Sequence, residues 1–138
     1  MGIENFGKVA FTTETKAADF VSYLEKGQVM TTKCKKCGTV TFPPKMDCPS
    51  CMSSEVEWVQ VTKPGKLATY TLVTYGPTGF EDDQPYTLGL ADFGDFKMFG
   101  RISPELAKTP AEIKVGMAVK VVPVKLANGH LAYEFQKA

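Results

Sequence analysis

Four cysteines lie within an 18-residue stretch of this 138-residue chain, and thiolates are the protein ligands that favour soft metal ions. They form two pairs with the same internal spacing, separated by ten residues: Cys34-x2-Cys37 and Cys48-x2-Cys51. Two intervening residues let a tight turn direct both sulfur atoms at one point about 2.3 Å away. The neighbouring Gly38 and Pro49 suit such turns. This spacing predicts a four-cysteine zinc ribbon that binds one zinc ion per chain.

Other chemistries of the same four cysteines remain open at this point. Iron in a rubredoxin-like site uses the same ligands, so the spacing does not separate iron from zinc. Disulfides belong to oxidising compartments, and the amino terminus lacks a signal-peptide pattern, so we expect free thiols in a reducing cytoplasm. A thioredoxin-like redox pair needs a βαβ pattern, which the sequence does not show. Because four cysteines fill every position of a tetrahedral ion, the predicted role of the metal is structural.

Catalytic groups beyond the cysteines have little support in the sequence. The single histidine, His130, follows an Asn-Gly turn, where an exposed side chain is expected. Serine-hydrolase, zinc-protease, phosphate-loop and dinucleotide-binding motifs do not occur. The acidic residues Asp82, Asp83, Asp92 and Asp95 fall on expected turns. We therefore expect a chain that is not catalytic on its own.

The elements that must position the cysteines begin with a short helix over residues 15–27. Ala17, Phe20, Val21 and Leu24 recur at helical spacing, with Thr15 at the start and Gly27 at the end. Such a short helix is marginal alone, so its apolar face must pack on this chain or on a partner. The cysteine segment that follows has few large apolar side chains, so its folding is expected to depend on the metal.

Strand patterns occupy the rest of the chain. The segments 56–61, 66–75, 86–93, 96–102, 118–126 and 130–136 are rich in β-branched and aromatic residues, and two Pro-led helical turns lie near 103–112. Counted from the long strand near Leu67, five strands with a helical insertion after the third give the order of an OB-fold barrel. A sandwich or an SH3-like barrel is also compatible. The predicted fold class is mainly β, with a tail and helix at 1–27, a zinc ribbon at 28–55 and a five-stranded OB-fold at 56–138.

The charge of the chain bears on whether such a barrel could bind nucleic acid. OB-folds often bind single-stranded nucleic acid through a basic groove with stacking aromatic side chains. Here the net charge is +1, and residues 61–100 contain three basic and five acidic side chains. Nucleic-acid binding therefore stays an alternative without much support. No apolar run is long enough to span a bilayer, so membrane insertion is not expected.

Together these segments resemble a known family of acyl-CoA-associated proteins, in which a helix and a rubredoxin-like zinc ribbon precede an OB-fold. The resemblance runs from about residue 15 to 135. Its motifs are Lys33-Cys34-Lys35-Lys36-Cys37-Gly38, Phe42-Pro43-Pro44, Cys48-Pro49-Ser50-Cys51, Trp58, Gly65, Tyr70-Thr71, Pro85-Tyr86 and Ile113-Lys114-Val115-Gly116-Met117. One hairpin departs from the family: members often have a form like LDEG, whereas this chain has Asp92-Phe93-Gly94-Asp95.

The resemblance implies a non-catalytic accessory subunit of a thiolase-like acyltransferase, in a hetero-oligomer whose partner supplies the catalytic residues and shares the acyl-CoA. In some members the partner is a hydratase or an aldolase. Two thiolase systems are compatible with it: benzoylsuccinyl-CoA thiolase of anaerobic toluene degradation, and an acetoacetyl-CoA thiolase or hydroxymethylglutaryl-CoA synthase complex. A free acyl-CoA-binding protein is a further alternative.

Two residue groups are candidates for these contacts. The first is a set of lysines around the cysteines, which either contact CoA phosphates or simply keep the surface soluble: Lys33, Lys35, Lys36 and Lys45. The second is a set of apolar residues that we expect at a partner interface: Phe20, Val21, Leu24, Phe42, Pro43 and Pro44.

Overall fold

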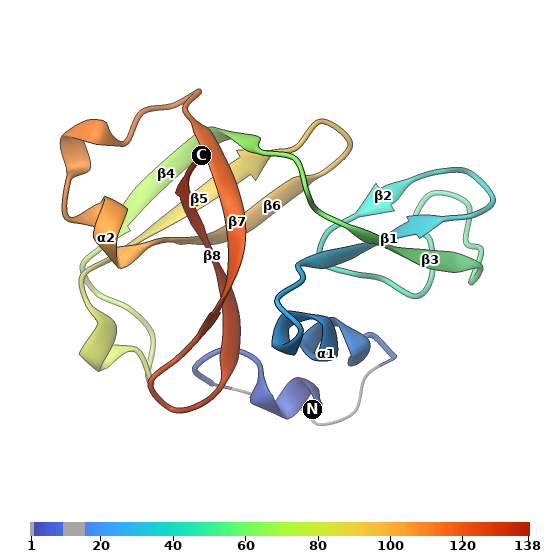
Figure 1. Ribbon diagram of the computed structural model, residues 1–138, viewed down its shortest axis with the longest axis horizontal. Coiled ribbons are helices and arrows are strands. Elements are labelled where there is room, and N and C mark those ends of the chain that lie inside the picture. Colours follow the sequence, from blue (N-terminus) through green and yellow to red (C-terminus); the bar gives the residue numbers. More distant parts are fainter. Residues whose placement is uncertain (1, 10–15) are drawn as a thin grey trace.

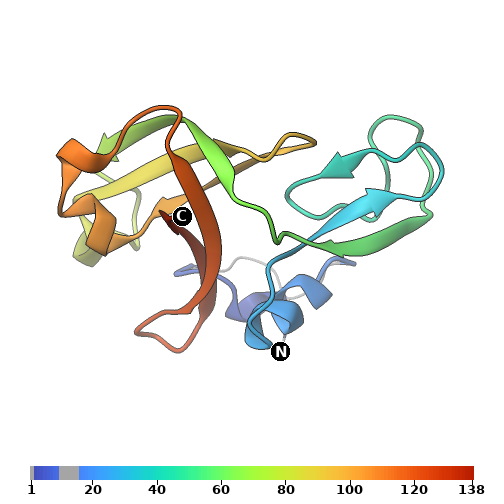
Figure 2. The same ribbon diagram turned by 45° about the horizontal axis from the view of Figure 1, so that its top comes forward.

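The structure is a computed structural model that describes residues 2–9 and 16–138. A three-stranded sheet that contains the cysteines lies beside a closed five-stranded barrel, and helix α1 lies between them (Figure 1). Figure 2 shows residues 61–64 as the direct chain connection between the two sheets. Within the described residues, no helix is long and apolar enough to cross a membrane.

The barrel has the strand order of an OB-fold, as the sequence predicts. Its strands follow the order β4-β5-β6-β8-β7, and all neighbours are antiparallel except β6 and β8, which are parallel. The helical insertion between the third and fourth strands is α2 and the 3-10 turn η3. The bounds are β4 (Gly65–Val73), β5 (Tyr86–Asp92), β6 (Lys97–Ile102), α2 (Pro104–Ala107), η3 (Pro110–Glu112), β7 (Ala118–Lys125) and β8 (Leu131–Lys137).

The three-stranded sheet, hereafter the ribbon, has the order β2-β1-β3. Its strands are β1 (Met30–Cys34), β2 (Val40–Thr41) and β3 (Val56–Gln60). The sequence assigns residues 56–60 to the barrel segment, but their backbone pairs with β1, from Met30 opposite Gln60 to Cys34 opposite Val56. The third ribbon strand therefore comes from the segment after the cysteines. A local sequence pattern can predict that this segment is a strand, but it does not predict which strand it pairs with in an antiparallel sheet.

Helix α1 (Asp19–Glu25) is shorter than the predicted helix. Residues 16–18 form turns before it, and the predicted cap Thr15 lies outside the described residues. The helix ends at Glu25, two residues before the predicted stop at Gly27, whose φ is 79° and whose N–H donates to Leu24 O, while Gln28 N donates to Tyr23 O. Phe20, Val21 and Leu24 are buried in the same core cluster as the barrel residues. Of the two alternatives that the sequence leaves open, the apolar face of α1 thus packs on this chain.

Aromatic rings join the ribbon to the barrel. The Phe42 ring, which follows β2, lies 5.4 Å from the Tyr133 ring, 6.1 Å from the Phe20 ring and 6.4 Å from the Phe96 ring, measured between centroids. Tyr133 donates a 2.7 Å hydrogen bond to Phe99 O, and burial raises the pKa of its phenol to about 12. A phenol that stays protonated keeps this donor in place at the junction.

The amino-terminal segment returns to the last strand of the barrel. Phe6 forms a parallel bridge with Leu131, and Gly7 N donates to Leu131 O at 2.7 Å. The side chain of His130, which the sequence places on an exposed turn, is half-buried, and its Nδ1 lies 2.9 Å from Gly7 O. The segment containing 2–9 is therefore held by residues near the other end of the chain.

Candidate metal centre

The four cysteine sulfur atoms converge on one point of the ribbon. All four lie within 4.8 Å of one another, and none forms a disulfide. The closest separations join the two pairs: Cys34 Sγ to Cys51 Sγ at 3.6 Å and Cys37 Sγ to Cys48 Sγ at 3.5 Å. Four sulfurs about 2.3 Å from a tetrahedral ion lie about 3.8 Å apart. The arrangement therefore fits a closed four-thiolate site, as predicted, with no position left for a catalytic water.

Two turns of matching geometry carry these sulfurs. In the first, Gly38 N donates to Cys34 O at 2.9 Å, and in the second, Met52 N donates to Cys48 O at 3.0 Å. Gly38 and Met52 stand one residue after their cysteine pairs and have φ values of 79° and 63°. The two halves of the site thus share one backbone design, although one half uses methionine where the other uses glycine.

Local hydrogen bonds set the ionisation of the thiols. The Thr39 side chain and then its backbone lower the pKa of Cys37 to about 6, and the Cys51 backbone lowers the pKa of Cys48. The Ser53 backbone lowers the pKa of Cys51, but burial and the neighbouring thiols outweigh it and raise that pKa to about 11. The lowered pKa of Cys37 favours its thiolate, which is the form that binds a metal ion, and a divalent cation would balance the charge of several thiolates.

Replacing Met52 by glycine should stabilise the metal-loaded protein. A side chain in the left-handed region costs roughly 1 kcal/mol, and Met52 is 79% exposed, so it contributes little packing there. We expect Met52→Gly to raise the free energy of unfolding by about 0.5 to 1 kcal/mol and Gly38→Ala to lower it by about 1 kcal/mol. Denaturant titration of the zinc-loaded variants measures both changes. If both substitutions changed the free energy of unfolding by the same amount and in the same direction, the explanation from the left-handed backbone at these positions would be contradicted.

The four predicted CoA-contact lysines do not meet in one cavity. Lys33 lines a cleft of about 260 Å³ between the ribbon and the β5–β6 hairpin. Lys45 lines a separate shallow pocket with Lys16 and Asp47. Lys35 and Lys36 are exposed on the first cysteine turn. Lys33 thus lines a cavity that the ribbon shares with the barrel, and Lys45 lines another one.

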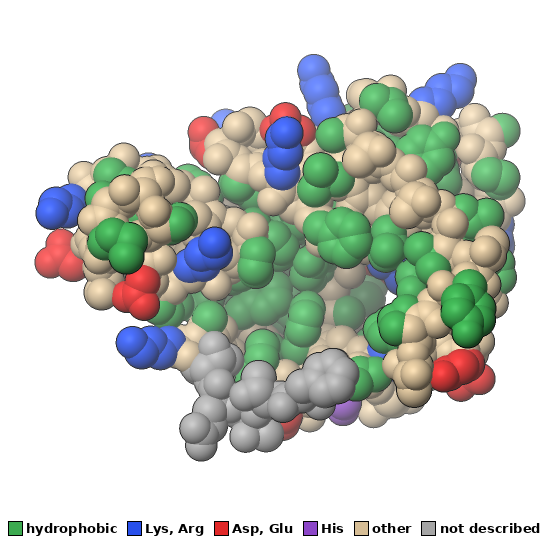
Figure 3. All heavy atoms as spheres, turned by 180° about the vertical axis from the view of Figure 1, so that it is seen from behind, with side chains coloured by type: hydrophobic (Ala, Val, Ile, Leu, Met, Phe, Trp, Pro, Cys, Tyr) green, Lys and Arg blue, Asp and Glu red, His purple; other side chains and the backbone are tan. Residues whose placement is uncertain are grey.

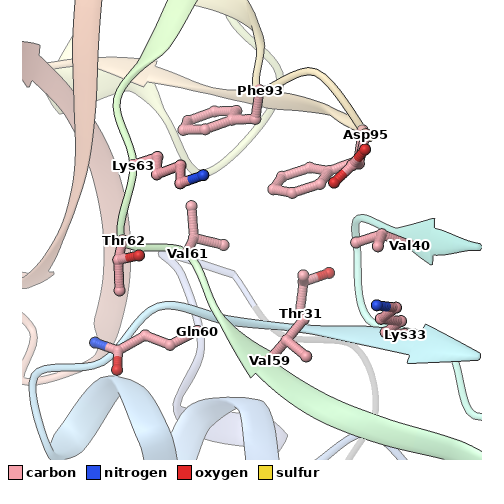
Figure 4. A pocket seen from close by; sticks show the side chains of 11 residues that line it. Thr31, Lys33, Val40, Val59, Gln60, Val61, Thr62, Lys63, Phe93 and Asp95 are labelled. Atoms are coloured by element: carbon pink, nitrogen blue, oxygen red, sulfur yellow. The ribbon is translucent and has the colours of Figure 1, made fainter. Parts of the chain in front are cut away.

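That shared cleft contains residues the sequence analysis did not select. Figure 4 shows Lys33 on the ribbon side, Lys63 on the connecting segment, and Phe93 with Asp95 on the hairpin. The rings of Phe93 and Phe96 stack at 5.3 Å with an interplanar angle of 6°. Only the departure of the hairpin from the family pattern drew attention to this region, because Lys63 belongs to no motif and lies far in sequence from Phe96.

The predicted interface residues separate into a buried and an accessible group. Phe20, Val21 and Leu24 are at most 5% exposed, so they do not offer free surface for a partner. Pro43 is exposed, and Phe42 and Pro44 are half-buried. A mainly apolar cavity of about 260 Å³ is lined by both groups and by the amino-terminal segment: Ile3, Phe6, Ala17, Phe20, Phe42, Pro43, Pro44 and Tyr133. Figure 3 shows apolar side chains gathered in a hollow between the two modules.

Acidic residues border one cavity at the barrel. A cavity of about 530 Å³ lies between the amino-terminal segment, the β4–β5 loop and the β7–β8 hairpin. Two of its cations are paired to one acid: Asp83 Oδ2 lies 3.4 Å from Lys8 Nζ and 3.3 Å from Arg101 Nη1. Glu81 and Asp82 precede Asp83 on the same 3-10 turn, and this acidic rim opposes phosphate binding.

A ribbon with a closed four-thiolate site, joined through a helix to an OB-fold barrel, defines a two-module class of ribbon and OB-fold proteins. Residues 22–57 match the ChsH2 rubredoxin-like zinc ribbon domain, and residues 58–124 match the ChsH2 C-terminal OB-fold domain. A DUF35 domain-containing scaffold protein of Pyrococcus furiosus is 34% identical over 105 residues, which cover 75% of this chain and 74% of that protein. The chain therefore belongs to the DUF35 family.

Further relatives extend the comparison. A DUF35 domain-containing scaffold protein of Methanocaldococcus jannaschii is 33% identical over 92 residues. These residues cover 65% of this chain and 63% of that protein, so the chain spans slightly under two thirds of the length of this relative. The benzoylsuccinyl-CoA thiolase subunit BbsA of Thauera aromatica is 28% identical over 110 residues, covering 76% of this chain and 73% of that subunit.

Solved structures share the fold. The chain resembles one titled Ltp2-ChsH2(DUF35) aldolase with a TM-score of 0.70 at 20% identity, over 92% of this chain and 98% of that chain. It resembles a DUF35 protein of Sulfolobus solfataricus with a TM-score of 0.60 at 20% identity, over 91% of this chain and 90% of that chain. These similarities confirm the ribbon and OB-fold architecture.

Proposed function

We propose that this protein is a non-catalytic scaffold subunit that binds a thiolase-like acyl-CoA enzyme. The apolar cavity at Phe42, Pro43 and Pro44 is the observation that carries the proposal, because it joins accessible apolar surface from the ribbon to the barrel ring of Tyr133. Apolar pockets rimmed by polar surface are where partner side chains anchor. The relatives named as scaffold proteins and as subunits of benzoylsuccinyl-CoA thiolase support a partner of this class.

A particular partner follows from the same relatives. Two of them, from Thauera aromatica and Geobacter metallireducens, are subunits of benzoylsuccinyl-CoA thiolase, at 28% and 27% identity. We therefore propose a thiolase of this kind, in the cytoplasm, as the first partner to test. An aldolase-type partner is the next, since the structure titled Ltp2-ChsH2(DUF35) aldolase has the same fold.

The metal proposed for the ribbon is one zinc ion per chain. Four thiolates at tetrahedral separations suit zinc, and the matching domain is named as a zinc ribbon. Its role is structural: the ion would hold β1, the two cysteine turns and β3 together, where the segment has few large apolar side chains to bury.

Shared binding of the acyl-CoA is the finer part of the proposal. The cleft of Lys33 and Lys63 beside the stacked Phe93 and Phe96 rings combines cations with an aromatic surface (Figure 4). This chemistry suits the phosphates and base of CoA. Lys35, Lys36 and Lys45 lie outside the cleft and would act only through the general charge of the ribbon surface.

Co-expression with a thiolase-like subunit from the same source tests the scaffold function. We expect the two chains to elute together in size-exclusion chromatography, and Pro44→Asp to abolish co-elution because a carboxylate would be desolvated in the apolar cavity. The control is Pro110→Asp, at an exposed proline on η3, which should leave co-elution unchanged. Separate elution together with full activity of the thiolase-like subunit alone would refute the proposal.

A further inference from the structure

Strand β4 has a free edge along most of its length. Its outer side pairs with β7 only at Gly65 and Lys66. Leu67 is covered by the loop that precedes β7, because Leu67 N donates to Met117 O at 2.9 Å and Gly116 N donates to Leu67 O at 2.7 Å. From residue 68 onward, no described strand pairs with β4 on the side away from β5. A row of backbone donors and acceptors therefore faces outward.

The side chains along this edge are exposed and uncharged. Every residue from 68 to 72 is exposed, including Tyr70 at 42% and Leu72 at 60%. The stretch Ala68–Val73 contains no charged residue and no proline, and most of its residues are β-branched or aromatic. Natural sheets usually protect an open edge with a charge, a proline or a very short strand.

The free edges of the ribbon show such protection. Strand β2 has only two residues, and β3 carries Glu57 within its five. The β4 edge is six residues long and lacks a comparable charge. A long, uncharged, unpaired edge favours the addition of another strand, which supplies the missing backbone hydrogen bonds.

We propose that this β4 edge pairs with the same edge of a second copy of the chain, antiparallel across a two-fold axis. With Thr71 opposite the second copy's Thr71, each Tyr70 stands opposite Leu72, and each Thr69 stands opposite Val73. Paired residues then share a face of the joined sheet, because directly opposed side chains of two antiparallel strands lie on the same side. Tyr70 and Leu72 gain aromatic-to-aliphatic contacts twice, once on each side of the axis.

The charges around the edge favour a second copy over an oppositely charged partner. No charged side chain lies between Ala68 and Val73, so neither repulsion nor a demand for a complementary charge arises in the paired segment. In this register Lys66 stands opposite Gly76, away from the second copy's Lys66. An interface related by a two-fold axis needs such self-complementarity. In this register residues 69–73 of each copy pair with residues 69–73 of the other, a small interface, so the dimer should depend on concentration.

Charge substitution at the axis tests the proposal on the full-length, zinc-loaded chain. Analytical ultracentrifugation should show the mass of the wild type rise with concentration from 15.1 kDa toward twice that value. Thr71→Lys and Thr71→Glu should each stay monomeric, because like charges then face each other across the axis. An equimolar mixture of the two variants should recover the dimer. Thr71 is exposed, so circular dichroism should show both variants folded.

Matched changes on another free edge separate this site from a general charge effect. Gln60 is exposed on β3, and Gln60→Lys and Gln60→Glu should dimerise as the wild type does. A wild type that stays monomeric at every concentration overturns the proposal. So does a dimer that persists in Thr71→Lys. Loss of catalytic-subunit binding by Thr71→Lys, with a monomeric wild type, would assign the edge to that subunit instead.

Discussion

Cys34→Ser or Cys48→Ser should abolish stoichiometric metal binding and unfold the ribbon. The two residues belong to different cysteine turns, and each substitution removes one of the four sulfur atoms that lie within 4.8 Å of one another. Binding of zinc to small thiolate sites contributes on the order of 10 to 16 kcal/mol, more than a segment with so few buried side chains can replace. Metal analysis should fall from about one zinc ion per chain to far below one.

The loss should be confined to the ribbon. Amide resonances of 30–60 should lose their dispersion in a nitrogen–proton spectrum, while the closed barrel of β4 to β8 keeps its own. Ser54→Ala is the control, because its hydroxyl bonds only to Asp47 in the same loop and is not a ligand. A serine variant that kept one zinc ion and a dispersed ribbon would contradict the four-thiolate assignment.

Phe42→Ala should cost about 2 to 3 kcal/mol of the free energy of unfolding. The ring lies against Phe20, Phe96 and Tyr133, and its removal leaves a gap at the junction of helix, ribbon and barrel. Fully buried phenylalanines lose about 3 to 5 kcal/mol on truncation, and Phe42 is half-buried, so a smaller value is expected. Denaturant titration monitored by the single tryptophan, Trp58 on β3, measures the change.

Phe99→Ala provides the matched control for this truncation. Phe99 is the same residue type on barrel strand β6, but its side chain is 58% exposed. Its loss should cost less than about 1 kcal/mol. Equal costs at the two positions would show that Phe42 does not join the modules, and separate unfolding transitions in Phe42→Ala would show that it does.

Local sequence signals predicted much of this molecule. The cysteine spacing located the metal site, since two residues between thiols determine a turn without reference to the rest of the chain. Gly27 marked the end of α1, and the Gly94 and Gly129 turns marked two hairpins, each with a positive φ. The OB-fold order followed from five strand patterns with a helical insertion after the third, an arrangement typical of that barrel.

Contacts between distant segments were beyond such signals. The pairing of β3 with β1 depends on which strand completes the ribbon sheet, and a strand pattern does not name its neighbour. Lys33 and Lys63 share a cleft only because the connecting segment folds back beside the hairpin. The sequence left open whether the apolar face of α1 packs on this chain or on a partner. Its burial against the barrel depends on the shape of the barrel surface, which a helical pattern does not predict.

The bridge between Phe6 and Leu131 also orders the events of synthesis. The ribosome completes the cysteine segment at Cys51, but β8 appears only after residue 131. At about 5 to 20 residues per second, several seconds separate the two. The ribbon can therefore take up its ion while the barrel is unfinished, whereas the bridge that joins the amino-terminal segment to the barrel forms only after the last strand has been made.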